Sequence, residues 1–340
     1  MAAGERASAA VRAIEGESGV QVVFTRPPSP VEDLVGDYFI TIGALTTPWE
    51  RAIRERFDLV ITADPAGVGS VSGPLLVLPE VSVDGEIVGH DGRCCVAALM
   101  RLVRRRPGRA QPVLIGLPHL RAVARLQAAA PEVGRHAVVI GDPRYDELLD
   151  ACTGPAGIHR GQRLGLILSA QGPGSLLGRS PAVLRRLATD LPTPGIRLVC
   201  RLAPEVWARH GRRQVLAWAG QVARERMEFL APEHSWHALA ATADFVVGDH
   251  GHDTAYAAAA GKPVYMANPV PKTVTGSLGE AVAKYGTVLD PSVPLASQFR
   301  WTPRPSFPVA RRITSAPGRS AFLLRRQCFR LMRITNPADH

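Results

Sequence analysis

Short apolar runs alternate along the first half of the chain with segments whose apolar residues recur at helical spacing. The runs that predict strands are residues 20–25, 57–64, 74–80, 112–118 and 136–142. The segments that predict helices are residues 31–44, 93–106 and 119–130. Such alternation is typical of a parallel sheet that is covered by helices on both faces.

The alternation restarts after residues 141–163, a segment rich in glycine and polar residues that we interpret as a linker. The strands predicted beyond it are residues 164–170, 196–202, 227–232, 244–250 and 263–267. The helices predicted there are residues 181–191, 212–225, 235–243, 254–261 and 278–286. The sequence therefore predicts an α/β fold with two Rossmann-like, doubly wound domains. Ligands of such sheets bind outside the carboxyl ends of the strands, so we expect a site in a cleft that the two domains face.

We expect four regions along the chain. They are an N-terminal segment at 1–18 that is partly flexible, an N-terminal domain at 19–145 on the acceptor side, a C-terminal nucleotide-donor domain at 146–300, and a basic tail at 301–340. Residues 318–334 of the tail predict an amphipathic helix with Arg326, Arg330 and Arg333 on one side. This helix either packs back on the domains or makes a peripheral contact with an anionic membrane or another protein.

Composition narrows the class of protein. The chain is 46% hydrophobic and carries a net charge of +10, and only Lys262, Lys272 and Lys284 among its 40 basic residues are lysines. A basic balance raises nonspecific affinity for anions, but no basic stripe with interleaved aromatic residues precedes the tail, so we expect no specific nucleic-acid partner. The five cysteines lack paired spacing, and no apolar run has the length of a bilayer span. We therefore expect a reduced, cytoplasmic protein.

The most chemically crowded stretch is "DFVVGDHGHDTAYAAAAGKPVYMA", residues 244–267. A predicted strand leads there directly into a predicted helix through Asp249, His250, Gly251, His252, Asp253 and Thr254. A metal site would use the two histidines and one aspartate, but four side chains in one short turn point in different directions, and no matching histidine pair exists elsewhere. We place Asp253 and Thr254 at the N-cap of the helix, and we favour a phosphate or sugar site over a metal, because helix N-termini attract anions.

Three further strand-to-helix turns fall in the second half. In "SAQGPGSLLGRSP", Gly172, Gly174 and Ser175 offer backbone N–H groups and a hydroxyl to a phosphate. Arg201 stands at the end of a predicted strand, where it can meet an anion. The third turn carries Glu233, His234 and His237, with Ser235 as the expected N-cap.

These turns resemble those of a known family. The segments "GDPRYDELL", "QGPGSLLGRSP" and "LAPEVW", together with residues 244–267, resemble motifs of GT-B glycosyltransferases, in the branch of CDP-glycerol glycerophosphotransferases and related actinobacterial proteins. The resemblance covers most of residues 19–334. It implies a GT-B fold and transfer of a sugar or polyol phosphate from a nucleotide-activated donor to an acceptor that the sequence does not identify, without a metal or other cofactor.

The resemblance also implies roles for particular residues. Gly172, Gly174, Ser175 and the turn from Asp249 to Thr254 would hold the donor diphosphate, and Arg179 or Arg201 would stabilise the leaving phosphate. The chain departs from the family pattern at three pairs, where the family tends to have His-Gly, His-Pro and Ser-Val. This chain has Pro79–Glu80, Ala203–Pro204 and His252–Asp253 there. Two interpretations follow. In the first, the chemistry is altered, with Glu80 as catalytic base and His252 as phosphate partner, and Asp84 or His90 are less favoured bases. In the second, transfer is lost and the chain is a binding or scaffold protein of a biosynthetic pathway.

Overall fold

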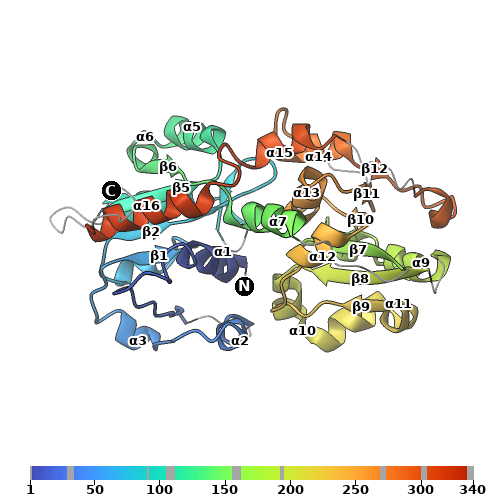
Figure 1. Cartoon of the computed structure of the whole chain (residues 1–340), viewed down its shortest axis with the longest axis horizontal. Helices are drawn as coiled ribbons and strands as arrows, with labels where there is room; N and C mark the ends of the chain where they lie inside the picture. The colour runs from blue at the N-terminus through green and yellow to red at the C-terminus, as the bar shows by residue number, and fades with distance from the viewer. Residues whose placement is uncertain are drawn as a thin grey trace. The chain divides into compact units, whose positions relative to one another are not determined.

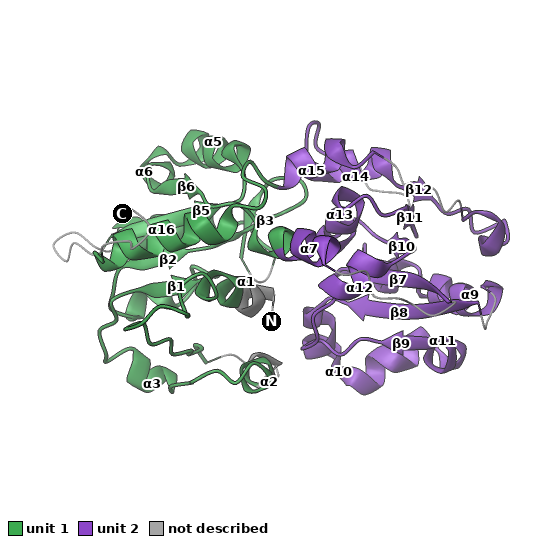
Figure 2. Cartoon of the chain, viewed as in Figure 1, with its two compact units in different colours: residues 1–146, 314–340 green, residues 147–313 purple. Residues whose placement is uncertain are grey.

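A computed structural model describes residues 2–28, 34–89, 92–104, 112–154, 162–191, 195–268, 273–299 and 305–334. The chain forms two units (Figure 2): unit 1 comprises residues 1–146 and 314–340, and unit 2 comprises residues 147–313. The chain leaves unit 1 within helix α7 (Pro143–Thr153) and returns to it at Thr314. In the described part of the chain, no helix is long and apolar enough to cross a membrane.

Unit 1 is built on a parallel sheet with the strand order β1-β2-β5-β6. Its strands are β1 (Val60–Thr62), β2 (Leu75–Val77), β5 (Val113–Leu117) and β6 (Ala137–Val139), and a separate antiparallel hairpin is formed by β3 (Glu80–Val81) and β4 (Ile87–Val88). Its helices are α1 (Ala2–Val11), α2 (Leu34–Thr41), α3 (Trp49–Ala52), the 3-10 turn η1 (Val68–Ser70), α4 (Val96–Arg104), α5 (Leu120–Ala129), α6 (Pro131–Gly134) and α16 (Ser320–Met332).

The apolar strands of unit 1 are buried on both faces of the sheet. Leu75 and Val77 pack into a core with residues of α4, α5 and α6, whereas Leu76 packs into a second core with residues of α1 and α16. Successive side chains of a strand point to opposite faces, so a continuous apolar run fits a sheet that is covered on both sides. The amphipathic helix predicted in the tail is confirmed as α16.

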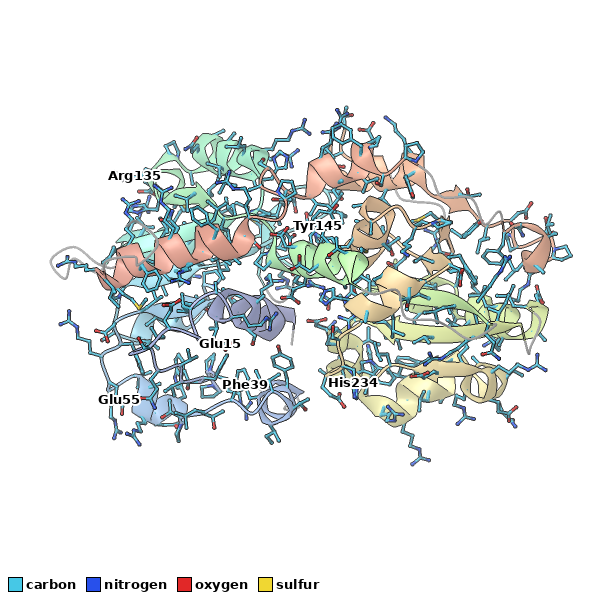
Figure 3. All side chains as sticks on the ribbon, in the orientation of Figure 1. Glu15, Phe39, Glu55, Arg135, Tyr145 and His234 are labelled. Carbon is cyan, nitrogen blue, oxygen red and sulfur yellow. The ribbon has the colours of Figure 1, made fainter. Side chains whose placement is uncertain are left out.

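The segment predicted as a linker instead contains a capped and anchored helix. Asp142 Oδ1 accepts a hydrogen bond from the backbone N–H of Tyr145 (3.2 Å; labelled in Figure 3), which caps the start of α7. The buried Asp146 carboxylate accepts hydrogen bonds from the backbone N–H groups of Gly318 (2.7 Å) and Ser320 (2.9 Å). The motif "GDPRYD" therefore holds the start of α16 in unit 1.

Unit 2 contains a six-stranded parallel sheet with the order β12-β11-β10-β7-β8-β9 (Figure 1). Its strands are β7 (Arg163–Ser169), β8 (Ile196–Leu202), β9 (Met227–Phe229), β10 (Phe245–Gly248), β11 (Val264–Met266) and β12 (Thr287–Val288). Its helices are α8 (Leu176–Arg179), α9 (Pro181–Asp190), α10 (Pro204–Ala219), α11 (Gln221–Arg226), α12 (His237–Thr242), α13 (His252–Ala259), α14 (Leu278–Tyr285), the 3-10 turn η2 (Leu295–Ser297) and α15 (Phe307–Ile313).

This strand order is that of a doubly wound Rossmann sheet, and the order reverses between β7 and β10. The predicted α/β fold with two Rossmann-like units is confirmed. One strand prediction is wrong: in residues 20–25 only Phe24 pairs, through a single bridge to Thr46. An apolar run forms a strand only where a neighbouring strand lies beside it, and here the pairing stops after one residue.

Candidate functional site

Two turns of unit 2 meet where the strand order reverses. One is the glycine-rich turn after β7, and the other is the histidine-rich turn after β10. The side chain of Asp249, directly after β10, is 1% exposed. Its Oδ2 accepts hydrogen bonds from the backbone N–H groups of Ala170 (2.9 Å), in the loop that follows β7, and Leu176 (2.8 Å), the first residue of α8. Its Oδ1 accepts one from Gly251 N–H (3.0 Å). One carboxylate thus fixes both turns at the reversal point, which is where doubly wound sheets bind ligands.

The electrostatics of Asp249 are those of a buried structural group. Burial raises the pKa of this carboxyl group, and the hydrogen bonds from Leu176 and Ala170 and the neighbouring His250 act in the opposite direction. Its oxygens already accept three backbone hydrogen bonds, and a carboxylate offers nothing that attracts a phosphate. Direct contact of Asp249 with a donor stays a prediction, whereas the described contacts make it the residue that positions the two turns.

The loop after β7 is held by its own hydroxyl group. Ser175 is the N-cap of α8, and its Oγ donates to the carbonyl of Gly172 (2.7 Å) and accepts from Gly178 N–H (3.1 Å). A Cβ on Gly178 would lie 2.4 Å from the carbonyl oxygen of Gly172, so only glycine fits there. In this structure the Ser175 hydroxyl group bonds to two residues of its own loop. Its predicted contact with a phosphate stays a prediction.

The same loop packs against the histidine-rich turn. A Cβ on Gly174 would lie 3.2 Å from Cε1 of His250, so the absence of a side chain at Gly174 makes room for the imidazole ring. Arg179, at the end of α8, is exposed. The structure therefore brings the loop of Gly172 and Gly174 next to His250 and the start of α13 in unit 2. That these residues hold a donor stays a prediction.

Helix α13 begins two residues earlier than the sequence predicts. Its N-cap is Gly251, which makes no side-chain capping bond, so Asp253 and Thr254 lie in the first helical turn rather than at the cap. The reason is the Asp249–Gly251 bond, which tightens the turn before the helix. The N–H groups in the first turn of a helix lack intrahelical partners and attract anions. Thr254 is buried, and its Oγ1 has no hydrogen-bond partner among the described residues.

The buried Arg201 forms an ion pair with the partly exposed Asp253. Arg201, in β8, is 2% exposed, and its Nε donates to Asp253 Oδ2 at 2.9 Å. Its guanidinium carbon lies 5.5 Å from the centre of the Trp236 ring. The pair ties β8 to the first turn of α13. It also means that the arginine predicted to meet a donor phosphate already has a counter-ion within the chain.

One further polar residue, Asn268, lies at the carboxyl edge of this sheet and was missed by sequence analysis. Asn268 follows β11, and its Oδ1 accepts a hydrogen bond from Ser180 Oγ, at the end of the loop that carries Gly172 and Gly174. The Asn268 side chain is buried, and its Nδ2 has no partner among the described residues. Asn268 stands directly after the strand predicted at 263–267, and this position is the signal that could have identified it.

The candidate bases lie in unit 1. Glu80, in β3, accepts a hydrogen bond from Arg6 Nη1 of α1 at 2.9 Å. Asp84 lies in the turn between β3 and β4, where its carbonyl accepts from Arg125 Nη1 (2.7 Å). His90 lies outside the described residues. Neither Glu80 nor Asp84 belongs to the unit that carries the two turns.

The turn that carries His234 and His237 makes contacts with nearby residues of unit 2. His234, labelled in Figure 3, is exposed and lies between β9 and α12. The N-cap of α12 is Trp236 rather than the predicted Ser235, whose Oγ lies 3.2 Å from Nδ1 of His237. His237 is 3.5 Å from Oε2 of Glu147. Across the described ranges, no group of three or more His, Cys, Asp or Glu side chains is arranged to hold a metal ion.

Comparison with known proteins identifies the fold. Neither protein-family models nor curated protein sequences match this chain. Among solved structures, the chain is similar to the MnaA–UDP co-structure from S. aureus (TM-score 0.56, 14% identity, covering 98% of this chain and 94% of that one). It is also similar to the UDP-GlcNAc 2-epimerase from Methanocaldococcus jannaschii (TM-score 0.55, 10% identity, 97% of both chains). A variant of the wall teichoic acid polymerase TagF matches with a TM-score of 0.53 (10% identity, 96% of this chain and 85% of that one).

These similarities span nearly the whole chain and both of its units. They establish a GT-B type fold of two Rossmann-like units, in agreement with the strand order of the unit 2 sheet. The class therefore contains both a polymerase and an epimerase, so the fold by itself does not select one reaction.

Proposed function

We propose that this chain is a GT-B type transferase that binds a nucleotide-activated sugar or polyol at the carboxyl edge of the unit 2 sheet. The observation that carries the proposal is the Asp249 carboxylate, which fixes a glycine-rich loop and an uncapped helix N-terminus together at the reversal point of the strand order. The first turn of a helix favours an anion such as a diphosphate, because the backbone N–H groups there point toward the N-terminal end of the helix. The motif resemblance narrows the proposal to the CDP-glycerol glycerophosphotransferase-like branch.

Each group has a role in the proposed reaction. The acceptor hydroxyl attacks the donor, the bond to the nucleotide phosphate breaks, and the acceptor proton passes to Glu80. The first-turn N–H groups of α13 and the imidazoles of His250 and His252 stabilise the charge on the leaving phosphate, with Arg179 contributing from α8. We propose no metal and no other cofactor.

A second candidate is binding without transfer. It is favoured by two ion pairs, Arg201–Asp253 and Arg6–Glu80, because each occupies a charged group that the transfer reaction would need. The MnaA–UDP co-structure shows a nucleotide bound to a protein of this fold. Nucleotide binding is therefore common to both candidates, and donor cleavage separates them.

The first experiment measures nucleotide binding by thermal unfolding. UDP, CDP, GDP and dTDP and their sugar- or glycerol-linked forms are each added in large excess over their dissociation constants. A bound donor at about 100 times its Kd stabilises the protein by about 2.7 kcal/mol, which raises Tm by about 5–10 °C for a unit of this size. The proposal is wrong if no nucleotide shifts Tm. The His252→Ala variant should lose most of the shift, whereas the matched variant His234→Ala, on an exposed turn of the same unit, should keep it.

The second experiment follows the fate of the bound donor. Release of nucleoside diphosphate or monophosphate, accelerated by a panel of hydroxyl acceptors and slowed by Glu80→Gln, supports transfer. Inversion at a sugar carbon without release, seen by NMR, indicates an epimerase. A donor that binds and stays intact supports the binding protein.

A further inference from the structure

The outward-facing side of α16 carries a single row of arginines. Phe322, Arg326 and Arg330 are spaced four residues apart, so at about 100° per residue they lie within an arc of roughly 80°. Arg319 precedes them at the N-cap and Arg333 follows at the C-cap, and all five residues are exposed. We name these five residues the α16 outer face. The row is roughly 20 Å long, at 1.5 Å per residue.

The charge of this row is not balanced within the described part of the chain. Residues 305–334 contain seven arginines and no acidic residue. Arg325, on the flank of α16, pairs with Glu17 at 2.6 Å. The four arginines of the outer face, by contrast, pair with no carboxylate of the described residues. The row therefore attracts a partner that is negatively charged along a similar length.

The opposite side of α16 is fixed to unit 1. Leu324, Cys328 and Leu331 belong to the core that also contains Leu76 and Ile140, so α16 lies over the unit 1 sheet (Figure 1). Asp146 holds the start of the helix through the N–H groups of Gly318 and Ser320. The outer face is thus presented on a rigid element, and a partner can dock on it without unfolding the helix.

Apolar side chains beside the arginines indicate which kind of negatively charged partner fits the α16 outer face. Phe322 is 51% exposed and Ile334, directly after the C-cap, is 48% exposed. The guanidinium carbon of Arg319 lies 5.8 Å from the centre of the Phe322 ring. An aromatic ring beside a cation is typical of helices that lie at a lipid interface, where the ring enters the acyl boundary and the cation meets the headgroups. A second copy of this chain would bring two arginine rows together, and a nucleic-acid backbone would leave Ile334 without an apolar contact.

We infer that the α16 outer face docks unit 1 on an anionic lipid surface. The arginines bind lipid phosphates, and Phe322 and Ile334 enter the headgroup boundary. Each basic residue near an anionic surface strengthens binding by roughly fivefold. Four arginines together therefore favour anionic over neutral vesicles by roughly two orders of magnitude or more. This inference is independent of the proposed transferase function, since it needs no nucleotide.

The test is co-sedimentation of the full chain with phosphatidylcholine vesicles that contain or lack phosphatidylglycerol, at about 0.1 M salt, where the Debye length is about 10 Å. The variant Arg326→Gln/Arg330→Gln removes two charges from the row. The matched control Arg209→Gln/Arg213→Gln removes two exposed charges from α10 of unit 2. Phe322→Ser removes the ring and leaves every charge in place. Circular dichroism and thermal unfolding confirm that each variant is folded.

We expect binding to phosphatidylglycerol vesicles, a loss of roughly 25-fold in the α16 variant and several-fold in Phe322→Ser, and almost no loss in the α10 control. The inference is overturned if the chain does not bind anionic vesicles, or if the α10 control weakens binding as much as the α16 variant. It is also overturned if a DNA duplex binds through α16 as tightly as the vesicles do and Phe322→Ser changes neither. That result would identify a nucleic-acid surface.

Discussion

Replacing Asp249 by alanine tests the centre of the candidate site. The change leaves the backbone N–H groups of Ala170, Leu176 and Gly251 without their acceptor. A hydrogen bond to a charged group contributes about 1.5 kcal/mol at the lower end of the usual range, so three such bonds amount to about 4–5 kcal/mol. Removing a buried charge that costs desolvation energy, as the raised pKa of Asp249 indicates, offsets part of this loss. We expect a net destabilisation of about 3 kcal/mol.

Two measurements check this expectation. A loss of about 3 kcal/mol lowers Tm by about 6–12 °C for a unit of this size. Hydrogen exchange should show faster exchange at the three amides of Ala170, Leu176 and Gly251 than at the strands beside them. The matched variant Glu225→Ala removes an exposed carboxylate on α11 and should change neither quantity. If the three amides stay protected and the loss is below about 1 kcal/mol, the carboxylate does not hold the two turns.

The variant Asp249→Asn separates the charge from the shape of the side chain. Its single oxygen can keep the bonds to Ala170 and Leu176, but its amide then faces Gly251 N–H, donor against donor. Because burial raises the pKa of Asp249 in the fold, its ionised form is less favourable there than in the unfolded chain. The stability of the wild type relative to Asp249→Asn should therefore be highest in acid and fall as pH rises from about 4 through the raised pKa. Urea unfolding between acid and neutral pH measures this difference, and the opposite slope would show that the backbone donors outweigh burial.

Three further predictions concern other residues. Asp253→Ala should destabilise unit 2 by about 2–3 kcal/mol, more than Arg201→Met does, because it takes the Asp253 carboxylate away from a buried guanidinium. Inorganic phosphate should recover part of that loss in urea unfolding, and equal losses without phosphate rescue would contradict the ion-pair argument. Gly178→Ala should lower Tm by several degrees, because its Cβ would meet a backbone oxygen at 2.4 Å; an unchanged Tm would mean that the loop adjusts freely. Burial raises the pKa of Cys328 to about 12, so Ellman's reagent should modify the exposed Cys94 in the folded protein and Cys328 only in denaturant. Modification of Cys328 without denaturant, detected by peptide mapping, would show that the α16 core opens.

The sequence predicts the α/β class and the positions of the site turns because these depend on local patterns. The apolar runs at 164–170 and 244–250 each lead into a turn that contains polar residues, and the structure pairs the two strands side by side. The contacts that define the site are not local. The bond from Ala170 N–H to Asp249 joins residues 79 positions apart, and that from Ser320 N–H to Asp146 joins residues 174 positions apart. Periodicity carries no information about such pairs.

The errors have physical causes that can be read from particular residues. The sequence places the N-cap of α13 at Asp253 or Thr254, because short polar side chains favour that position. The structure uses Gly251 instead, since the Asp249 carboxylate already satisfies its N–H group. The hairpin of β3 and β4 escapes detection because each strand is two residues long, too short for an alternation to show.

The motifs that carry the family resemblance turn out to have largely architectural roles. In "GDPRYD", Asp142 caps α7 and Asp146 anchors α16, and in "GDHG", Asp249 joins two turns. Ser175, within "GPGSLLG", closes its own loop. A chain can therefore keep these motifs because it keeps the fold, whether or not it keeps the chemistry. The residues that discriminate are those that depart from the pattern, His252 and Asp253, which lie on the first turn of α13 where a phosphate would bind. If Asp253 is the counter-ion that replaces an external anion at Arg201, phosphate will rescue Asp253→Ala and leave the wild type unchanged, and donor binding must then rely on the helix N–H groups and His252.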